Sequence, residues 1–137
     1  MKKVLLSIKP QFVEEIRCGK KIYEYRKSIF KDKSIAKMLI YSSSPIKKIV
    51  GECDIETIVS GNPNEVWEQT KLYGGITQDF FFEYFKNKET AYAIKMSNVI
   101  FYNQPILLTD IGVEYAPQSF RYLDILTVSA NRYHCSA

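Results

Sequence analysis

The sequence is poor in the residues that bind metals or form disulfide frameworks. Its 137 residues include three cysteines and one histidine. Cys18, Cys53 and Cys135 are widely spaced and form no CxxC pair, and the single histidine is His134. Structural zinc sites use closely spaced ligand pairs, and disulfide scaffolds use an even number of cysteines. We therefore expect reduced cysteines, no metal site and no cofactor.

Long apolar runs and low-complexity segments are also missing. Runs such as Phe80 to Phe82 are far too short to cross a bilayer. The apolar stretch that follows Lys3 ends at Lys9, so it is too short for a signal-peptide core. The six glycines and five prolines are scattered along the chain and mark no linker. We expect one cytoplasmic domain over residues 1–137, with a tail from about residue 124 that could be appended.

Charge is distributed unevenly along the chain, although the net charge is only +4. Residues 1–50 contain thirteen Lys and Arg against four Asp and Glu, which is +9. Residues 51–137 contain six against eleven, which is −5. A basic surface attracts phosphate, so this asymmetry favours a nucleic-acid partner. Lysines also solubilise exposed strands and protect sheet edges, and the charge pattern fits that role equally well.

Hydrophobic periodicity and helix-capping residues predict a chain in which strands dominate. The expected strands cover residues 4–8, 21–27, 37–41, 46–59 and 91–102. The expected helices run from Pro10 to a C-terminal cap at Gly19, from Asn62 to about Lys71, and from Thr77 through Phe85. An irregular tail follows the last strand. Helices that fall only in the connections are typical of an α+β protein with a small β-barrel.

Residues 19–26, GKKIYEYR, resemble the GxKxxExR signature of ASCH domains, a branch of the PUA-like fold. Other pieces of that pattern follow in the family's order, covering roughly residues 4 to 123: SIKP at 7–10, YSSSP at 41–45, and PQSF at 117–120. The resemblance implies a PUA-like barrel with a cleft beneath its first helix. The motif's lysine, glutamate and arginine would line that cleft.

The motif combines charges of both signs. In a strand, Glu24 and Arg26 share one face, whereas Lys21 has the opposite parity, so the three meet only if the chain bends after Gly19. A Lys and an Arg beside a Glu favour one another's charged forms, and such a site attracts phosphate while keeping an acceptor for a base amide. The predicted ligand-binding residues are Lys9, Lys21, Glu24, Arg26, Tyr41 and Ser43. Alternatively, Glu24 and Arg26 form a partly buried ion pair that closes the barrel mouth, and the tyrosines only pack.

Three functions fit these residues. The favoured one is binding of RNA or of a modified nucleoside or nucleotide, with no membrane partner. A second is hydrolysis of modified nucleosides, because acetylcytidine amidohydrolases resemble ASCH domains. They use the motif lysine, a threonine three residues later and a glutamate; here Lys21 matches, but Glu24 replaces the threonine. The third is a metal-independent ribonuclease in which Lys21 and Arg26 stabilise the phosphorane and Glu24 deprotonates the 2′-hydroxyl. In an enzyme, Lys21 and Glu24 would be catalytic; whether the protein is one stays open.

Overall fold

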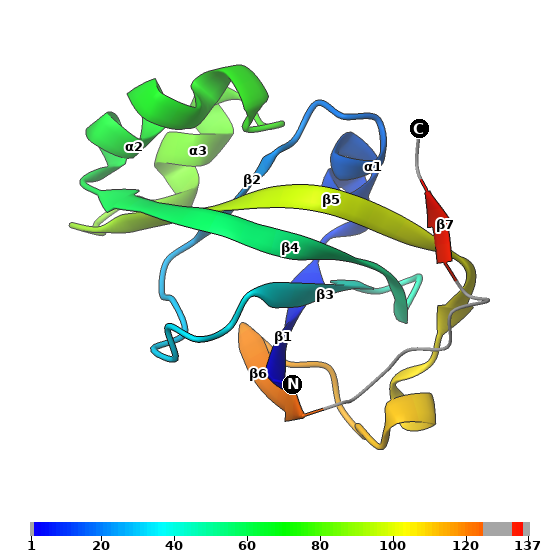
Figure 1. The fold of residues 1–137 in the computed structure, drawn as a ribbon. Coiled ribbons are helices and arrows are strands. Elements are labelled where there is room, and N and C mark those ends of the chain that lie inside the picture. Colours follow the sequence, from blue (N-terminus) through cyan, green and yellow to red (C-terminus); the bar gives the residue numbers. More distant parts are fainter. Residues whose placement is uncertain (1, 125–132, 136–137) are drawn as a thin grey trace.

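The computed structural model describes residues 2–124 and 133–135, which form one mixed sheet with helices in its connections (Figure 1). The strand order is β2-β5-β4-β3-β1-β6, and β7 also pairs with β5. The strands are β1 (Lys2–Ile8), β2 (Tyr23–Arg26), β3 (Lys37–Ser42), β4 (Lys48–Gly61), β5 (Ala91–Ile106), β6 (Phe120–Asp124) and β7 (Tyr133–Cys135). The helices are α1 (Pro10–Arg17), α2 (Pro63–Thr70) and α3 (Gln78–Tyr84), with short 3-10 turns η1 (Lys71–Tyr73) and η2 (Leu108–Ile111). The α+β class is confirmed. Most of the tail predicted from about residue 124 lies outside the described residues.

The helices begin where their capping residues predict. Pro10 occupies the first turn of α1, and Gly19, with φ of 82°, follows its C-cap. The Asn62 side chain accepts a hydrogen bond from the Glu65 amide at the start of α2, and Thr77 accepts one from the Phe80 amide at the start of α3. These bonds satisfy amides that have no partner within the helix.

No helix of the described residues is long and apolar enough to span a membrane.

The sheet is strongly bent by its two longest strands, β4 and β5. Their antiparallel register shifts at three places, between Ile49 and Gly51, between Glu52 and Asp54, and between Ile55 and Thr57. Such irregularities bend a strand and increase its twist. The helices α2 and α3 lie side by side at one end of the β4–β5 pair (Figure 1), whereas α1 contacts β3.

The sheet does not close into a barrel by strand pairing in the described residues, which is one detail in which the structure differs from the expected barrel. The strand order ends at β2 on one side and at β6 on the other. Arg26 of β2 instead donates hydrogen bonds to the Ser7 carbonyl in β1, at 2.6 Å, and to the Ser119 carbonyl just before β6, at 3.4 Å. An arginine side chain therefore joins the two edges of the sheet.

Residues 107–124 contain more regular structure than their sequence suggests. Residues 120–124 form β6, which pairs antiparallel with β1 from Lys2 opposite Asp124 to Leu6 opposite Phe120. The prediction of an irregular tail is therefore wrong for this segment. Its partner lies more than a hundred residues away, so no local pattern reveals the pairing. Ser119 and Gln118 reach the motif region only because β6 pairs there.

Core residues alternate between the two faces of the sheet. On β3, Met38 and Ile40 pack in the cluster that includes Val13 and Ile16 of α1. Leu39 and Tyr41, which alternate with them along β3, belong to a second cluster on the other face. A third, aromatic cluster forms where α2 and α3 meet the sheet, and its larger members are Tyr25, Trp67, Phe81 and Phe85. These helices thereby form one side of the region around β2.

Candidate functional site

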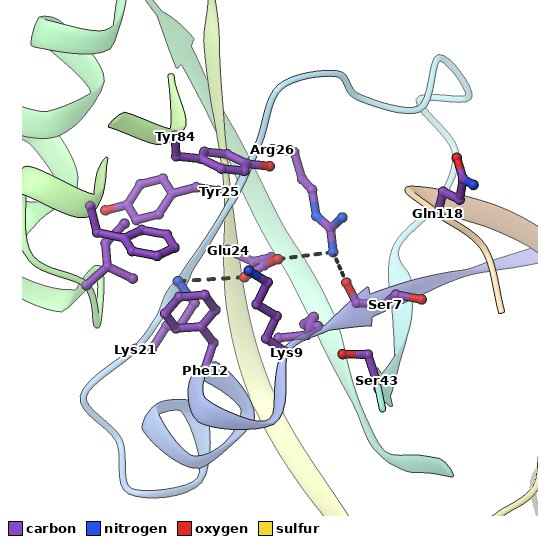
Figure 2. Close-up of a pocket in the computed structure, with 13 residues that line it drawn as sticks. Ser7, Lys9, Phe12, Lys21, Glu24, Tyr25, Arg26, Ser43, Tyr84 and Gln118 are labelled. Atoms are coloured by element: carbon purple, nitrogen blue, oxygen red, sulfur yellow. Dashed lines mark hydrogen bonds and ion pairs between the residues drawn. The ribbon is translucent and has the colours of Figure 1, made fainter. Parts of the chain in front are cut away.

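A cavity of about 340 Å³ opens beside β2, between α1 and α3 (Figure 2). Its polar lining comes from both ends of the chain and comprises Ser7, Lys9, Lys21, Glu24, Arg26, Ser43 and Gln118. Its apolar lining is mainly aromatic and comprises Ile8, Phe12, Tyr25, Ile76, Phe80 and Tyr84. The cavity therefore combines charged groups with ring faces, as small-molecule sites commonly do.

Lys21, Glu24 and Arg26 form an ion cluster in this cavity. Glu24 lies in the middle: Oε1 is 3.6 Å from Lys21 Nζ, and Oε2 is 3.1 Å from Arg26 Nη2 (Figure 2). The three side chains are only 1%, 9% and 11% exposed, in that order. Buried charges persist when they are paired and hydrogen-bonded, and each of these contacts at least one opposite charge.

Lys21 reaches the cluster because it lies outside β2. The chain turns after α1, where the amides of Lys20 and Lys21 both donate to the Glu15 carbonyl at 3.0 Å. Lys21 then forms an isolated bridge with Gly74 before the strand begins at Tyr23. The parity of the strand therefore does not apply to Lys21, and its side chain reaches Glu24.

The Lys21 ammonium is held from several sides. Nζ donates to the Gly74 carbonyl at 2.8 Å and lies 4.7 Å from the centre of the Tyr25 ring and 5.6 Å from that of Phe12. Burial lowers the pKa of the Lys21 amine, an effect that the Glu24 carboxylate opposes. The Lys21 amine is therefore desolvated and paired with Glu24, and any anion or carbonyl that enters the cavity meets it without competing bulk water.

A turn containing two glycines completes the surroundings of Lys21. Gly75 has φ of 67°, and a Cβ at this position would lie 2.5 Å from Lys21 Cβ. A Cβ on Gly74 would collide with the Tyr25 hydroxyl. From the sequence, this pair only follows a helix that is expected to end at about Lys71. Its close approach to the motif lysine depends on a contact between residues more than fifty positions apart.

Tyr25 is fixed by a short chain of hydrogen bonds. The Thr70 hydroxyl donates to the Val66 carbonyl at 2.7 Å, so the Tyr25 hydroxyl, also at 2.7 Å, donates to Thr70. Burial raises the pKa of Tyr25 to about 12. The tyrosine is therefore a neutral, oriented ring against the Lys21 ammonium.

The mouth of the cavity is basic and has an aromatic side. Lys9 is exposed at the N-terminus of α1, whose first turn has no acidic residue, so the positive end of the helix dipole is not neutralised there. Phe12 and Phe80 meet edge to face across the α1–α3 gap, with ring centroids 5.2 Å apart. The Ser7 hydroxyl is already used, since it donates to the Pro117 carbonyl at 2.7 Å.

Comparison with known proteins identifies the family. A family described as a domain of unknown function (DUF365) matches residues 1–115. The chain is also 30% identical over 105 residues to an ASCH domain-containing ribonuclease of Zymomonas mobilis, covering 77% of this chain and 68% of that protein. The chain belongs to the ASCH domain family.

Solved ASCH structures share this fold. The crystal structure of ASCH from Zymomonas mobilis superposes with a TM-score of 0.79 at 27% identity, covering 89% of this chain and 87% of that one. A mutant of the same protein gives a TM-score of 0.80 at 28% identity, covering 90% and 91%. The resemblance noted in the motif therefore extends to nearly the whole chain.

In this ASCH domain, Lys9, Lys21, Glu24, Arg26 and Ser43 all line the cavity. Their roles as ligand-binding or catalytic residues stay predictions. The alternative prediction was that Glu24 and Arg26 form a partly buried structural ion pair. Arg26 does pair with Glu24, and it also joins the edges of the sheet.

Tyr41 is the exception among the predicted residues. It does not line the cavity, and its side chain is buried in the core on the other face of the sheet. The reason is strand parity: in β3, Ile40 faces the α1 side, so Tyr41 faces away from it. Stacking on a ligand in this cavity would fall instead to Phe12, Phe80 and Tyr84, which the sequence did not single out as site residues. Phe80 and Tyr84 lie in an aromatic stretch typical of helix packing, so the sequence gives no sign that they also line the cavity.

Proposed function

We propose that the cavity binds one nucleotide unit of a single-stranded RNA. The observation that carries this proposal is the buried ion cluster opening into a cavity with aromatic sides. A volume of about 340 Å³ is at the lower end of the range of small-ligand sites, about 300–1,000 Å³. Such a cavity suits a single base with its sugar better than a duplex, and sequence-specific RNA recognition uses unstacked bases of this kind.

The charges of the cavity support a phosphate-bearing ligand. Its lining contains three cationic side chains, Lys9, Lys21 and Arg26, against one anionic side chain, Glu24. Lys9 is exposed at the mouth, where a backbone phosphate would remain, while a base would enter towards the ion cluster. Stacking of a base on an aromatic side chain contributes about 1–3 kcal/mol. The Zymomonas mobilis relative, named a ribonuclease, also supports an RNA ligand.

Binding of a short single-stranded RNA should weaken steeply as salt rises, because counterions are released when phosphates are neutralised. The Lys9→Ala variant should bind more weakly and show a shallower salt dependence, with the slope of log K against log salt reduced by about 1. Fluorescence anisotropy with a labelled oligomer measures both quantities. Lys88→Ala is the matched control, since Lys88 is exposed and does not line the cavity. Salt-independent binding, or equal effects of the two substitutions, would reject the proposal.

A metal-independent ribonuclease is the second candidate, favoured by the desolvated Lys21 and by the named activity of the relative. Lys21 and Arg26 would stabilise the charge that develops on the phosphorane, and Glu24 would accept the 2′-hydroxyl proton. Glu24, however, is the anion that pairs with both buried cations, and accepting a proton would leave those two cations without it. The geometry therefore supports binding better. Hydrolysis of acetylated nucleosides stays a prediction.

The ribonuclease candidate predicts RNA cleavage that persists with a chelator and is lost in the Lys21→Met variant, by at least about a hundredfold for the loss of one charge-stabilising donor. Gel analysis of a labelled single strand measures the cleavage, and thermal unfolding confirms that the variant folds. Lys20→Met is the control, because Lys20 is exposed and does not line the cavity. Cleavage that survives the Lys21 substitution would remove this lysine from the mechanism.

A further inference from the structure

The ion cluster presents its hydrogen-bonding groups in a fixed order. The Glu24 carboxylate lies between the Lys21 ammonium, at 3.6 Å, and the Arg26 guanidinium, at 3.1 Å (Figure 2). An ammonium and a guanidinium only donate hydrogen bonds, and a carboxylate only accepts them. The order along the cluster is therefore donor, acceptor, donor.

Each member of the cluster keeps capacity for a ligand. An ammonium has three N–H groups, and contacts of Lys21 with described residues use one for Gly74 and one for Glu24. The carboxylate has about four acceptor positions, and the two cations occupy two of them. Arg26 has five N–H groups, and three contacts account for them only in part: Ser7, Ser119 and Glu24.

The side chains of the cluster are held by further contacts, which favours the same order when a ligand enters. Lys21 is held by the Gly74 carbonyl and by the Tyr25 ring, and Arg26 is held by the backbone of two strand edges. The side chains are at most 11% exposed, so bulk water does not replace their missing partners. A base whose edge mismatches this order leaves buried polar groups unpaired, which is costly.

The four RNA bases differ in the order of groups on their pairing edges. Uracil presents O4, N3–H and O2, which is acceptor, donor, acceptor. Cytosine presents donor, acceptor, acceptor; guanine presents acceptor, donor, donor; adenine presents a donor beside an acceptor. Uracil alone complements donor, acceptor, donor in full.

We infer that the cavity selects a uracil ring, with the Glu24 carboxylate accepting N3–H and with Lys21 and Arg26 donating to the two flanking carbonyl oxygens. This inference rests on the proposed function, since it names the base bound at the same site. The aromatic side chains Phe12, Phe80 and Tyr84 supply ring faces for the pyrimidine. The modest cavity volume also favours a pyrimidine over the larger purines.

Affinity for short homopolymers at one fixed salt concentration tests the inference. Oligouridine should bind at least about tenfold more tightly than oligocytidine or oligoadenosine, as expected when a mismatched edge leaves a buried group unpaired. Oligomers of 3-methyluridine keep the ring and the carbonyls but lack the N3–H donor, and they should lose this advantage. Equal binding of uridine and 3-methyluridine oligomers, or tighter binding of cytidine, would overturn the inference while leaving RNA binding intact.

Binding measurements with mononucleotides and with DNA oligomers distinguish this inference from the proposed binding of RNA. Uridine monophosphate that binds when no oligomer does would support the imide contact and overturn RNA as the ligand. Failure of every oligomer and mononucleotide to bind would overturn both. Oligothymidylate has the same imide edge, so it should also bind more tightly than oligodeoxycytidylate.

The Glu24→Gln variant probes the central acceptor with little change in shape. An amide offers a donor as well as an acceptor, so this variant should lose the preference for uridine over cytidine, and thermal unfolding shows whether it is folded. Glu83→Gln is the matched control, because Glu83 is exposed on α3 and does not line the cavity. An unchanged uridine preference in folded Glu24→Gln protein would reject the role of the carboxylate. If that variant does not fold, the 3-methyluridine comparison on the unchanged protein still decides.

Discussion

Replacing Glu24 with alanine is expected to lower the free energy of unfolding by about 3–5 kcal/mol, the usual cost of breaking a buried ion pair. The substitution leaves Lys21, 1% exposed, and Arg26, 11% exposed, without the carboxylate that they share. Arg26 also joins the two edges of the sheet, so its displacement would loosen the fold around the cavity. Urea denaturation followed by circular dichroism measures the loss.

The Glu14→Ala variant is the control for this prediction. Glu14 pairs with Arg17 at 3.5 Å on the surface of α1, where the two side chains are 69% and 45% exposed. Exposed pairs of this kind contribute about 0–1 kcal/mol, so this variant should unfold almost as the unchanged protein does. Similar losses in the two variants would mean that the ion cluster is not the buried, coupled unit described here.

A double substitution separates stability from binding at the same residues. Apolar replacements of both partners of a buried ion pair are often neutral or stabilising. The Lys21→Met/Glu24→Leu protein should therefore recover part of the stability that Glu24→Ala loses, while its RNA affinity stays below that of the unchanged protein. A recovery of binding along with stability would contradict the direct role that we propose for these side chains.

The parts of the fold that local chemistry determines were predictable from the sequence. Asn62 and Thr77 start helices because their side chains accept bonds from free helical amides, and both caps are observed. The GxKxxExR motif likewise pointed to the residues that form the ion cluster. Spacing within one segment was enough for these inferences.

The parts that depend on long-range pairing were not predictable. Strand β6 forms because residues 120–124 meet β1, and this pairing brings Gln118 to the cavity. Tyr41 was predicted to bind a ligand, but the parity of β3 buries it on the other face. The hydrogen bonds of Arg26 were not predictable either, because they join β2 to segments from both ends of the chain.

The contact between Gly75 and Lys21 is another long-range contact that the sequence does not predict. The Gly75→Ala variant tests whether this contact matters for binding. This variant should lose at least about 1–2 kcal/mol of stability from the left-handed backbone alone. It should also lose more than about tenfold in RNA affinity, because the new methyl group, 2.5 Å from Lys21 Cβ, must displace the lysine. Calorimetry and anisotropy titration measure the two effects.

Gly112→Ala is the control that separates backbone strain from displacement of Lys21. Gly112 has φ of 75°, close to the 67° of Gly75, but a Cβ there meets no atom within 4 Å. The two variants share the strain of a left-handed alanine, whereas only Gly75→Ala pushes on the site. Gly112→Ala should therefore lose stability while keeping its affinity for RNA. If both variants kept full affinity, the exact position of Lys21 would not matter for binding, and the ion cluster would be a structural device that closes the sheet.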